Sequence, residues 1–146
     1  MLTSDSRAVP LNGEFLLVVD DDDAVTSSVT RFLAKNGYRT KRARNGIEAI
    51  ELLQRESVVP SLVLIDLVMP RMGGLELMER LDRDHSFRDV PRVVMSGHDR
   101  LQRAPRARFL DFLIKPFDPD ELLCLVRATS HTSCSRWAAA SSDRQS

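Results

Sequence analysis

The stretch LLVVDDDDAV (residues 16–25) places four aliphatic residues directly before four acids, Asp20 to Asp23. A continuous apolar run that is rich in Val is typical of a strand buried on both faces of a parallel sheet. Acids packed side by side repel one another, so four of them at one strand end need a cation or separate surroundings. The stretch therefore predicts a core strand that ends in concentrated negative charge, with a helix after it.

Further strands are indicated by apolar runs of the same kind. The first run extends back to Phe15 as FLLVV (15–19), and others follow at SLVLI (61–65), RVVM (92–95) and DFLI (111–114). A weakly alternating segment, YRTKRA (38–43), suits the edge of a sheet. These segments together predict five strands.

Helical patterns lie between these runs. Apolar residues repeat with helical spacing in 24–36, in 46–56, after the Gly73–Gly74 turn, and in a final segment that begins at Pro119. Gly37 is a typical stop signal, and Asn45 and Asp118 are typical N-caps. Because strands alternate with helices, the sequence predicts an α/β fold with a doubly wound, five-stranded parallel sheet.

The bulk properties favour one domain of a soluble, cytoplasmic protein. The chain has 146 residues with 21 basic and 21 acidic side chains, so it lacks the overall charge typical of nucleic-acid or anionic-membrane binding. No apolar run approaches the roughly 20 residues that cross a bilayer, and we expect no membrane segment. Cys124 and Cys134 fit no metal or redox spacing.

The domain is expected at residues 14–128. Residues 1–13 are polar, and residues 129–146 lose helical periodicity and become rich in Ser and Ala. Both ends are therefore interpreted as flexible segments. Trp137, in the C-terminal segment, could dock on another surface.

Chemically active side chains follow four of the expected strands. Ligands of an open parallel sheet bind outside the carboxyl ends of its strands, and those ends carry Asp20 and Asp21, then Asp66, Ser96 and Lys115. A carboxylate cluster is unfavourable without a cation, and hard oxygen ligands suit Mg²⁺. Asp22 and Asp23 have a separate explanation, since acids in the first turn of a helix interact well with its dipole.

Asp66 stands alone at the tip of a central strand, after LVLI (62–65). A bound Mg²⁺ would keep it ionised and able to attack phosphorus, which would form an aspartyl phosphate. The metal and Lys115 would neutralise the oxygens of the transferring phosphoryl group. The five residues together, at four strand ends, indicate this phosphoryl-transfer chemistry more specifically than any one of them alone.

Four motifs carry a family resemblance: VVDDD (18–22), LIDLVMP (64–70), VVMSG (93–97) and DFLIKPF (111–117). With them, residues 14–128 resemble the receiver domain of bacterial two-component response regulators. The resemblance implies a flavodoxin-like topology, Mg²⁺ as cofactor and phosphorylation by a histidine kinase or a histidine phosphotransfer protein. The downstream partner, the pathway and the oligomeric state are not implied.

Individual roles follow from the resemblance. Asp66 would be the phosphoacceptor, and Ser96 and Lys115 would bind the phosphoryl group. The ligands of Mg²⁺ would be Asp20, Asp21, Asp66 and the backbone carbonyl of Val68. Ser96 and Phe112 would form the conformational switch, although Phe112 could equally be a plain core residue. Val68 and His98 would tune the lifetime of the phosphate, and the Lys115–Pro116 peptide bond would be cis.

One segment departs from the family pattern. Lys115 lies only 19 positions after Ser96, about three fewer than the family has, and Pro105 lies between them. The fourth helix is therefore expected to be short or irregular. Arg92 and four arginines within 100–108 favour a solvated basic face over a binding site for an acidic partner or nucleic acid.

The leading hypothesis is a stand-alone receiver that signals by altered partner binding, by phosphorelay or as a phosphate sink. It would have no DNA-binding domain, and its only catalysis would be its own phosphoryl transfer and autodephosphorylation. A second hypothesis is a phosphorylation-independent scaffold with receiver architecture. A third is a haloacid-dehalogenase-type phosphohydrolase, in which Asp118 and Asp120 would be the acidic metal pair; their position at a helix start argues against it.

Overall fold

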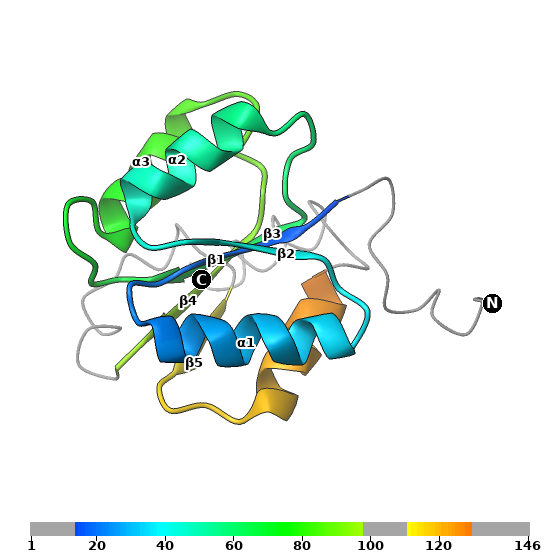
Figure 1. Ribbon diagram of the computed structural model, residues 1–146. Coiled ribbons are helices and arrows are strands. Elements are labelled where there is room, and N and C mark those ends of the chain that lie inside the picture. The colour runs from blue at the N-terminus through cyan, green and yellow to red at the C-terminus, as the bar shows by residue number, and fades with distance from the viewer. Residues whose placement is uncertain (1–13, 98–110, 130–146) are drawn as a thin grey trace, which may run out of the picture.

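Five parallel strands form one sheet in the computed structural model, which describes residues 14–97 and 111–129 (Figure 1). The bounds of the strands and helices are β1 (Leu16–Val19), α1 (Asp23–Lys35), β2 (Thr40–Ala43), α2 (Gly46–Arg55), β3 (Leu62–Asp66), α3 (Gly74–Arg83), β4 (Arg92–Ser96) and β5 (Asp111–Ile114), followed by a helix over 119–129. From β1 to β4, strands and helices alternate along the chain as expected.

The strand order is β2-β1-β3-β4-β5, with all neighbours parallel. Helices α2 and α3 cover one face of the sheet, and α1 and the helix over 119–129 cover the other (Figure 1). The chain therefore moves outward in opposite directions from β1 and β3, which makes their shared carboxyl edge the topological switch point. This confirms the predicted doubly wound, flavodoxin-like fold, and β2 lies at the sheet edge as its weak alternation predicted.

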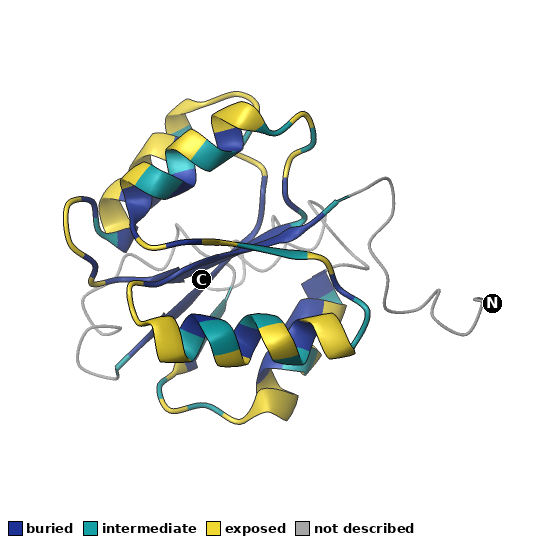
Figure 2. Ribbon diagram, in the orientation of Figure 1, coloured by how far each residue is buried: buried dark blue, intermediate teal, exposed yellow. Residues whose placement is uncertain are grey.

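Both faces of the central strands are buried (Figure 2). Leu17, Val19 and Ile65 pack in one apolar cluster with α2 and α3. Their neighbours Leu16 and Leu64 pack in the opposite cluster, against α1 and the helix over 119–129. Since successive side chains of a strand point to opposite faces, burial on both sides requires the continuous apolar runs seen in the sequence.

The helix ends follow local hydrogen-bonding rules. Asp22 is the N-cap of α1, where its carboxylate accepts from the N–H groups of Ala24 and Val25 at 3.0 and 3.3 Å. Asn45 caps α2 through the N–H of Glu48. Gly37 has φ of 91°, a left-handed conformation that suits glycine, and it ends α1 as expected.

The interpretation of Arg92 as part of a solvated basic face is wrong. Arg92 is only 1% exposed at the start of β4, and its guanidinium pairs with Asp82 of α3. It also donates to the carbonyl oxygens of Phe87 and Arg88, at 3.4 and 3.2 Å. A buried cation requires partners such as this carboxylate and these carbonyl oxygens. Through them, Arg92 binds the segment between α3 and β4 to the sheet.

Several predictions lie outside the described residues. These are the short or irregular fourth helix with Pro105 and the arginines of 100–108, the role of His98, and the flexibility of residues 1–13 and of residues 130–146. Thr129, expected at the start of the flexible C-terminal segment, is instead buried as the last residue of the helix over 119–129. Among the helices that are described, none combines the length and the apolar character needed to span a membrane.

Candidate functional site

The register of the sheet brings the predicted side chains to one edge. Val19 lies beside Ile65 in the pairing of β1 with β3, so the residues that follow, Asp20 and Asp66, emerge next to each other. Ser96 ends β4 one position beyond the partner of Asp66, and it lies beside the last residue of β5, after which Lys115 follows. All five predicted side chains therefore belong to the carboxyl edge of the sheet.

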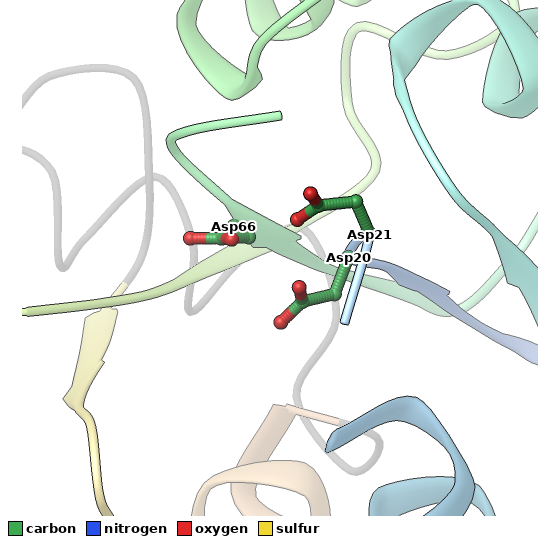
Figure 3. Close-up of side chains that lie close together, drawn as sticks. All are labelled: Asp20, Asp21 and Asp66. Atoms are coloured by element: carbon green, nitrogen blue, oxygen red, sulfur yellow. The ribbon is translucent and has the colours of Figure 1, made fainter. Parts of the chain in front are cut away.

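Three carboxylates meet at this edge (Figure 3). One oxygen atom each from Asp20, Asp21 and Asp66 can be chosen so that all three lie within 4.8 Å of one another. Asp20 and Asp66 are buried, with 1% and 7% exposure, while Asp21 is exposed. The cluster can therefore be reached from solvent on the Asp21 side.

Lys115 is the cation of the cluster. Its Nζ lies 2.6 Å from Oδ2 of Asp20 and 3.6 Å from Oδ2 of Asp66, so its hydrogen bond is to Asp20. Burial lowers the pKa of Lys115, but the hydrogen bond to Asp20 and the charge of Asp66 outweigh burial and raise it overall. Lys115 is therefore firmly protonated, and its one charge is shared between two carboxylates.

Asp66 retains unfavourable electrostatics despite this lysine. Burial and then the neighbouring charge of Asp20 raise the pKa of Asp66 from 3.8 to about 6, against the opposing effects of Lys115 and the backbone of Val68. Desolvation and like charge both penalise the ionised carboxyl group. The site therefore carries more negative charge than its ammonium group balances.

The remaining predicted residues surround this cluster. Ser96 is buried, with 2% exposure, and its carbonyl accepts from the N–H of Lys115 at 2.9 Å. Val68 is 50% exposed, while Phe112 is partly buried and packs against the cluster under α2 and α3. The Lys115–Pro116 peptide bond is cis, as the resemblance implied.

The loop after Asp66 depends on two glycines whose structural role the sequence analysis missed. A Cβ at Gly74 would lie 2.5 Å from the carbonyl oxygen of Asp66, and one at Gly46 would lie 2.4 Å from the side chain of Met72. The Gly73–Gly74 pair was interpreted only as a turn. Gly74 in fact lets the start of α3 pack directly against the end of β3.

Comparison with known proteins identifies this arrangement. Residues 16–127 match the family described as the response regulator receiver domain. The chain belongs to that family. Receiver domains act in two-component signalling, as signalling proteins rather than as classical enzymes, and this membership removes the dehalogenase-type alternative. Asp118, one of the metal ligands of that alternative, instead accepts from the N–H of Asp120 at the start of the helix over 119–129.

Individual relatives agree with this membership. The chain is 37% identical over 116 residues to response regulator MprA of Mycobacterium leprae (strain TN), an alignment that covers 77% of this chain and 49% of the relative. It is 38% identical over 117 residues to response regulator Rre1 of Synechocystis sp. (strain ATCC 27184 / PCC 6803 / Kazusa), again over 77% and 49%. This receiver chain thus spans about half the length of these curated relatives.

A solved structure agrees with the fold and the family. The crystal structure of the receiver domain of NtrX from Brucella abortus superposes with a TM-score of 0.73 at 29% identity. The match covers 81% of this chain and 99% of that receiver domain. The sheet, the helices and the acidic edge described above thus belong to a receiver domain.

Proposed function

We propose that this receiver is a phosphorylation-dependent switch that accepts a phosphoryl group on Asp66 from a histidine kinase or a histidine phosphotransfer protein. The observation that carries the proposal is the position of Asp66 beside two carboxylates and an ammonium group at the switch point of the sheet. A carboxylate nucleophile flanked by groups of both signs suits phosphoryl transfer, in which catalysis is mainly positioning and electrostatic stabilisation.

The acidic cluster fits Mg²⁺. Three carboxylates and one ammonium leave the site short of positive charge, and the raised pKa of Asp66 reflects that imbalance. Mg²⁺ prefers a few carboxylate oxygens together with waters, and the exposed Asp21 leaves room for waters. We assign Asp20, Asp21, Asp66 and the backbone carbonyl of Val68 as the residues that would hold it. When bound, the ion would supply positive charge to the phosphoryl oxygens.

The transfer itself would use an oxygen of Asp66. With a pKa of about 6, most Asp66 side chains are ionised at neutral pH even without the metal. The carboxylate oxygen forms the new bond to phosphorus as the bond between phosphorus and the donor histidine nitrogen breaks, and that nitrogen keeps the electron pair. Lys115, 3.6 Å from Oδ2 of Asp66, would then pair with a phosphoryl oxygen.

The response would begin at Ser96. Its side chain lies at the end of β4, next to β5, and would bond the phosphoryl group after transfer. Phe112, partly buried on β5, would change its packing as Ser96 moves, which shifts the population of two arrangements. Val68 and His98 would set how long the phosphate persists, and the exposed apolar side chain of Val68 offers no group to orient an attacking water.

Residues 14–128 would constitute this switch. Its catalysis would be limited to its own phosphorylation and dephosphorylation, and its output would be altered binding to a downstream protein. The charge balance of the chain supports a protein partner over nucleic acid.

Intact-mass spectrometry tests the proposal. The chain is incubated with acetyl phosphate, with and without Mg²⁺, beside Asp66→Asn and the control Asp82→Asn, which changes an acid on α3 outside the acidic cluster. We expect a gain of one phosphoryl group that needs Mg²⁺, occurs in Asp82→Asn and is absent from Asp66→Asn. An unmodified wild-type chain under all conditions would instead support the scaffold hypothesis.

A further inference from the structure

An apolar groove lies between α1 and the chain that follows β5. Its volume is about 490 Å³, within the range of small-ligand pockets. Val25 and Phe32 of α1 and Phe117 after β5, each only partly buried, line it together with the more deeply buried Val29 and Leu122. Lys115 also lines the groove, so the groove adjoins the acidic cluster that Lys115 contacts.

We propose that Trp137 of this same chain occupies the groove. Apolar surface of this kind gains free energy when it is covered, and residues 130–146 contain one large apolar side chain, that of Trp137. An indole ring suits such a groove because it buries a large area with few rotatable bonds.

The chain is long enough to make this contact. The helix over 119–129 forms one wall of the groove through Leu122, and its end lies about 10 Å further along the helix axis. Trp137 lies eight positions after Thr129, and an extended segment of that length spans about 26 Å. Trp137 can therefore return to the groove beside its own helix.

Charge at the rim favours the same occupant. Asp118, Asp120 and Glu121 are exposed on the segment that supplies Phe117, Pro119 and Leu122 to the groove. Arg136 directly precedes Trp137. When the indole ring enters the groove, the guanidinium of Arg136 would lie near these acids, which carry the opposite charge. This attraction favours the chain direction that brings Arg136 to the acids over the reverse direction.

Trp137 is the single tryptophan of the chain, so its fluorescence reports on this one contact. In the full-length chain we expect native emission at shorter wavelength than in urea, and several-fold weaker quenching by acrylamide. Both properties should be independent of protein concentration. Emission and quenching equal to those of the unfolded chain would overturn the proposal, and protection that is lost on dilution would assign the groove to a second copy instead.

Matched substitutions in α1 test whether the groove is what shields Trp137 from solvent and quencher. Ser28 lines the groove and Ala34 does not, although both are exposed. Ser28→Lys should return emission and quenching to the unfolded values, whereas Ala34→Lys should leave both unchanged, with folding of each checked by circular dichroism. Phe32→Ala, which removes apolar contact without adding charge, should also weaken protection. Protection that survives both groove variants would place Trp137 elsewhere and overturn the proposal.

Discussion

Two partly buried ion pairs at opposite ends of the sheet differ in how their charge is balanced. At the amino end of β4, the guanidinium of Arg92 meets one carboxylate, that of Asp82, and two backbone carbonyls. At the carboxyl edge, the single ammonium of Lys115 faces both Asp20 and Asp66. In the first arrangement one carboxylate balances one cation. The second keeps surplus negative charge, which is the condition for taking up a further cation and a phosphoryl group.

The largest effect is expected from breaking the Arg92–Asp82 pair. Arg92→Ala leaves two carbonyl groups and a cavity where a buried side chain stood, and it should lower the free energy of unfolding by about 2–4 kcal/mol. Urea unfolding followed by circular dichroism measures this. Asp82→Asn, which keeps the side-chain shape at a partly exposed position, should cost clearly less. Equal losses in the two variants would contradict the role given to the carbonyl contacts.

At the carboxyl edge, removing a charge should raise the free energy of unfolding instead of lowering it. Because the pKa of Asp66 is raised from 3.8 to about 6 in the fold, its contribution to the stability of the metal-free protein falls as pH rises from about 4 through 6. Asp66→Asn removes that loss and should be more stable than wild type by about 1–2 kcal/mol at pH 7. The gain should shrink towards zero near pH 4. Unfolding free energies measured across this pH range check the prediction, and a pH-independent difference would contradict it.

Mg²⁺ should stabilise the protein through the acidic cluster at the carboxyl edge and not through the Arg92–Asp82 pair. Binding to the folded chain adds about 1.4 kcal/mol to wild-type stability at a free concentration ten times its Kd. Asp66→Asn and Asp20→Asn should gain much less, while Asp82→Asn should gain as much as wild type. Thermal unfolding with and without Mg²⁺ compares the four chains. A gain shared by all of them would mean that the ion binds elsewhere.

The smallest expected effect is that of replacing Asp22. It tests whether Asp22 only stabilises the helix start, unlike the proposed metal-binding acids that precede it. Asp22 caps α1 through two backbone N–H groups, so Asp22→Ala should cost about 1 kcal/mol of stability and Asp22→Asn much less. Neither change should weaken the stabilisation by Mg²⁺, which is measured in the same thermal assay. A loss of Mg²⁺ binding in Asp22→Ala would show that the acids do not divide into a metal pair and a helix-start pair.

The sequence was most informative where local chemistry determines structure. Buried parallel strands need continuous apolar runs, and β5 coincides with DFLI (111–114). Caps are equally local, since Asn45 and Asp22 bond to N–H groups only two or three residues away. Because ligands of a parallel sheet bind at the carboxyl ends of its strands, the sequence alone also predicts that Asp20, Asp66 and Lys115 are neighbours.

What the sequence did not reveal depends on contacts between distant segments. Arg92 looked like a surface cation because nothing nearby in the sequence shows that Asp82 and two carbonyls enclose it. Likewise, the closer approach of Lys115 to Asp20 than to Asp66 is a matter of 1 Å between side chains of different strands. The need for glycine at Gly74 appears only when α3 is packed against β3.

The most direct test of the account is to locate the phosphoryl group. The chain is phosphorylated with acetyl phosphate and Mg²⁺, reduced with borohydride, which converts an aspartyl phosphate to homoserine, and sequenced as peptides by mass spectrometry. Homoserine at position 66, with Asp20, Asp21 and Asp22 unmodified, is the predicted result. Homoserine at one of those acids and not at position 66 would contradict the assignment of Asp66 as the phosphoacceptor.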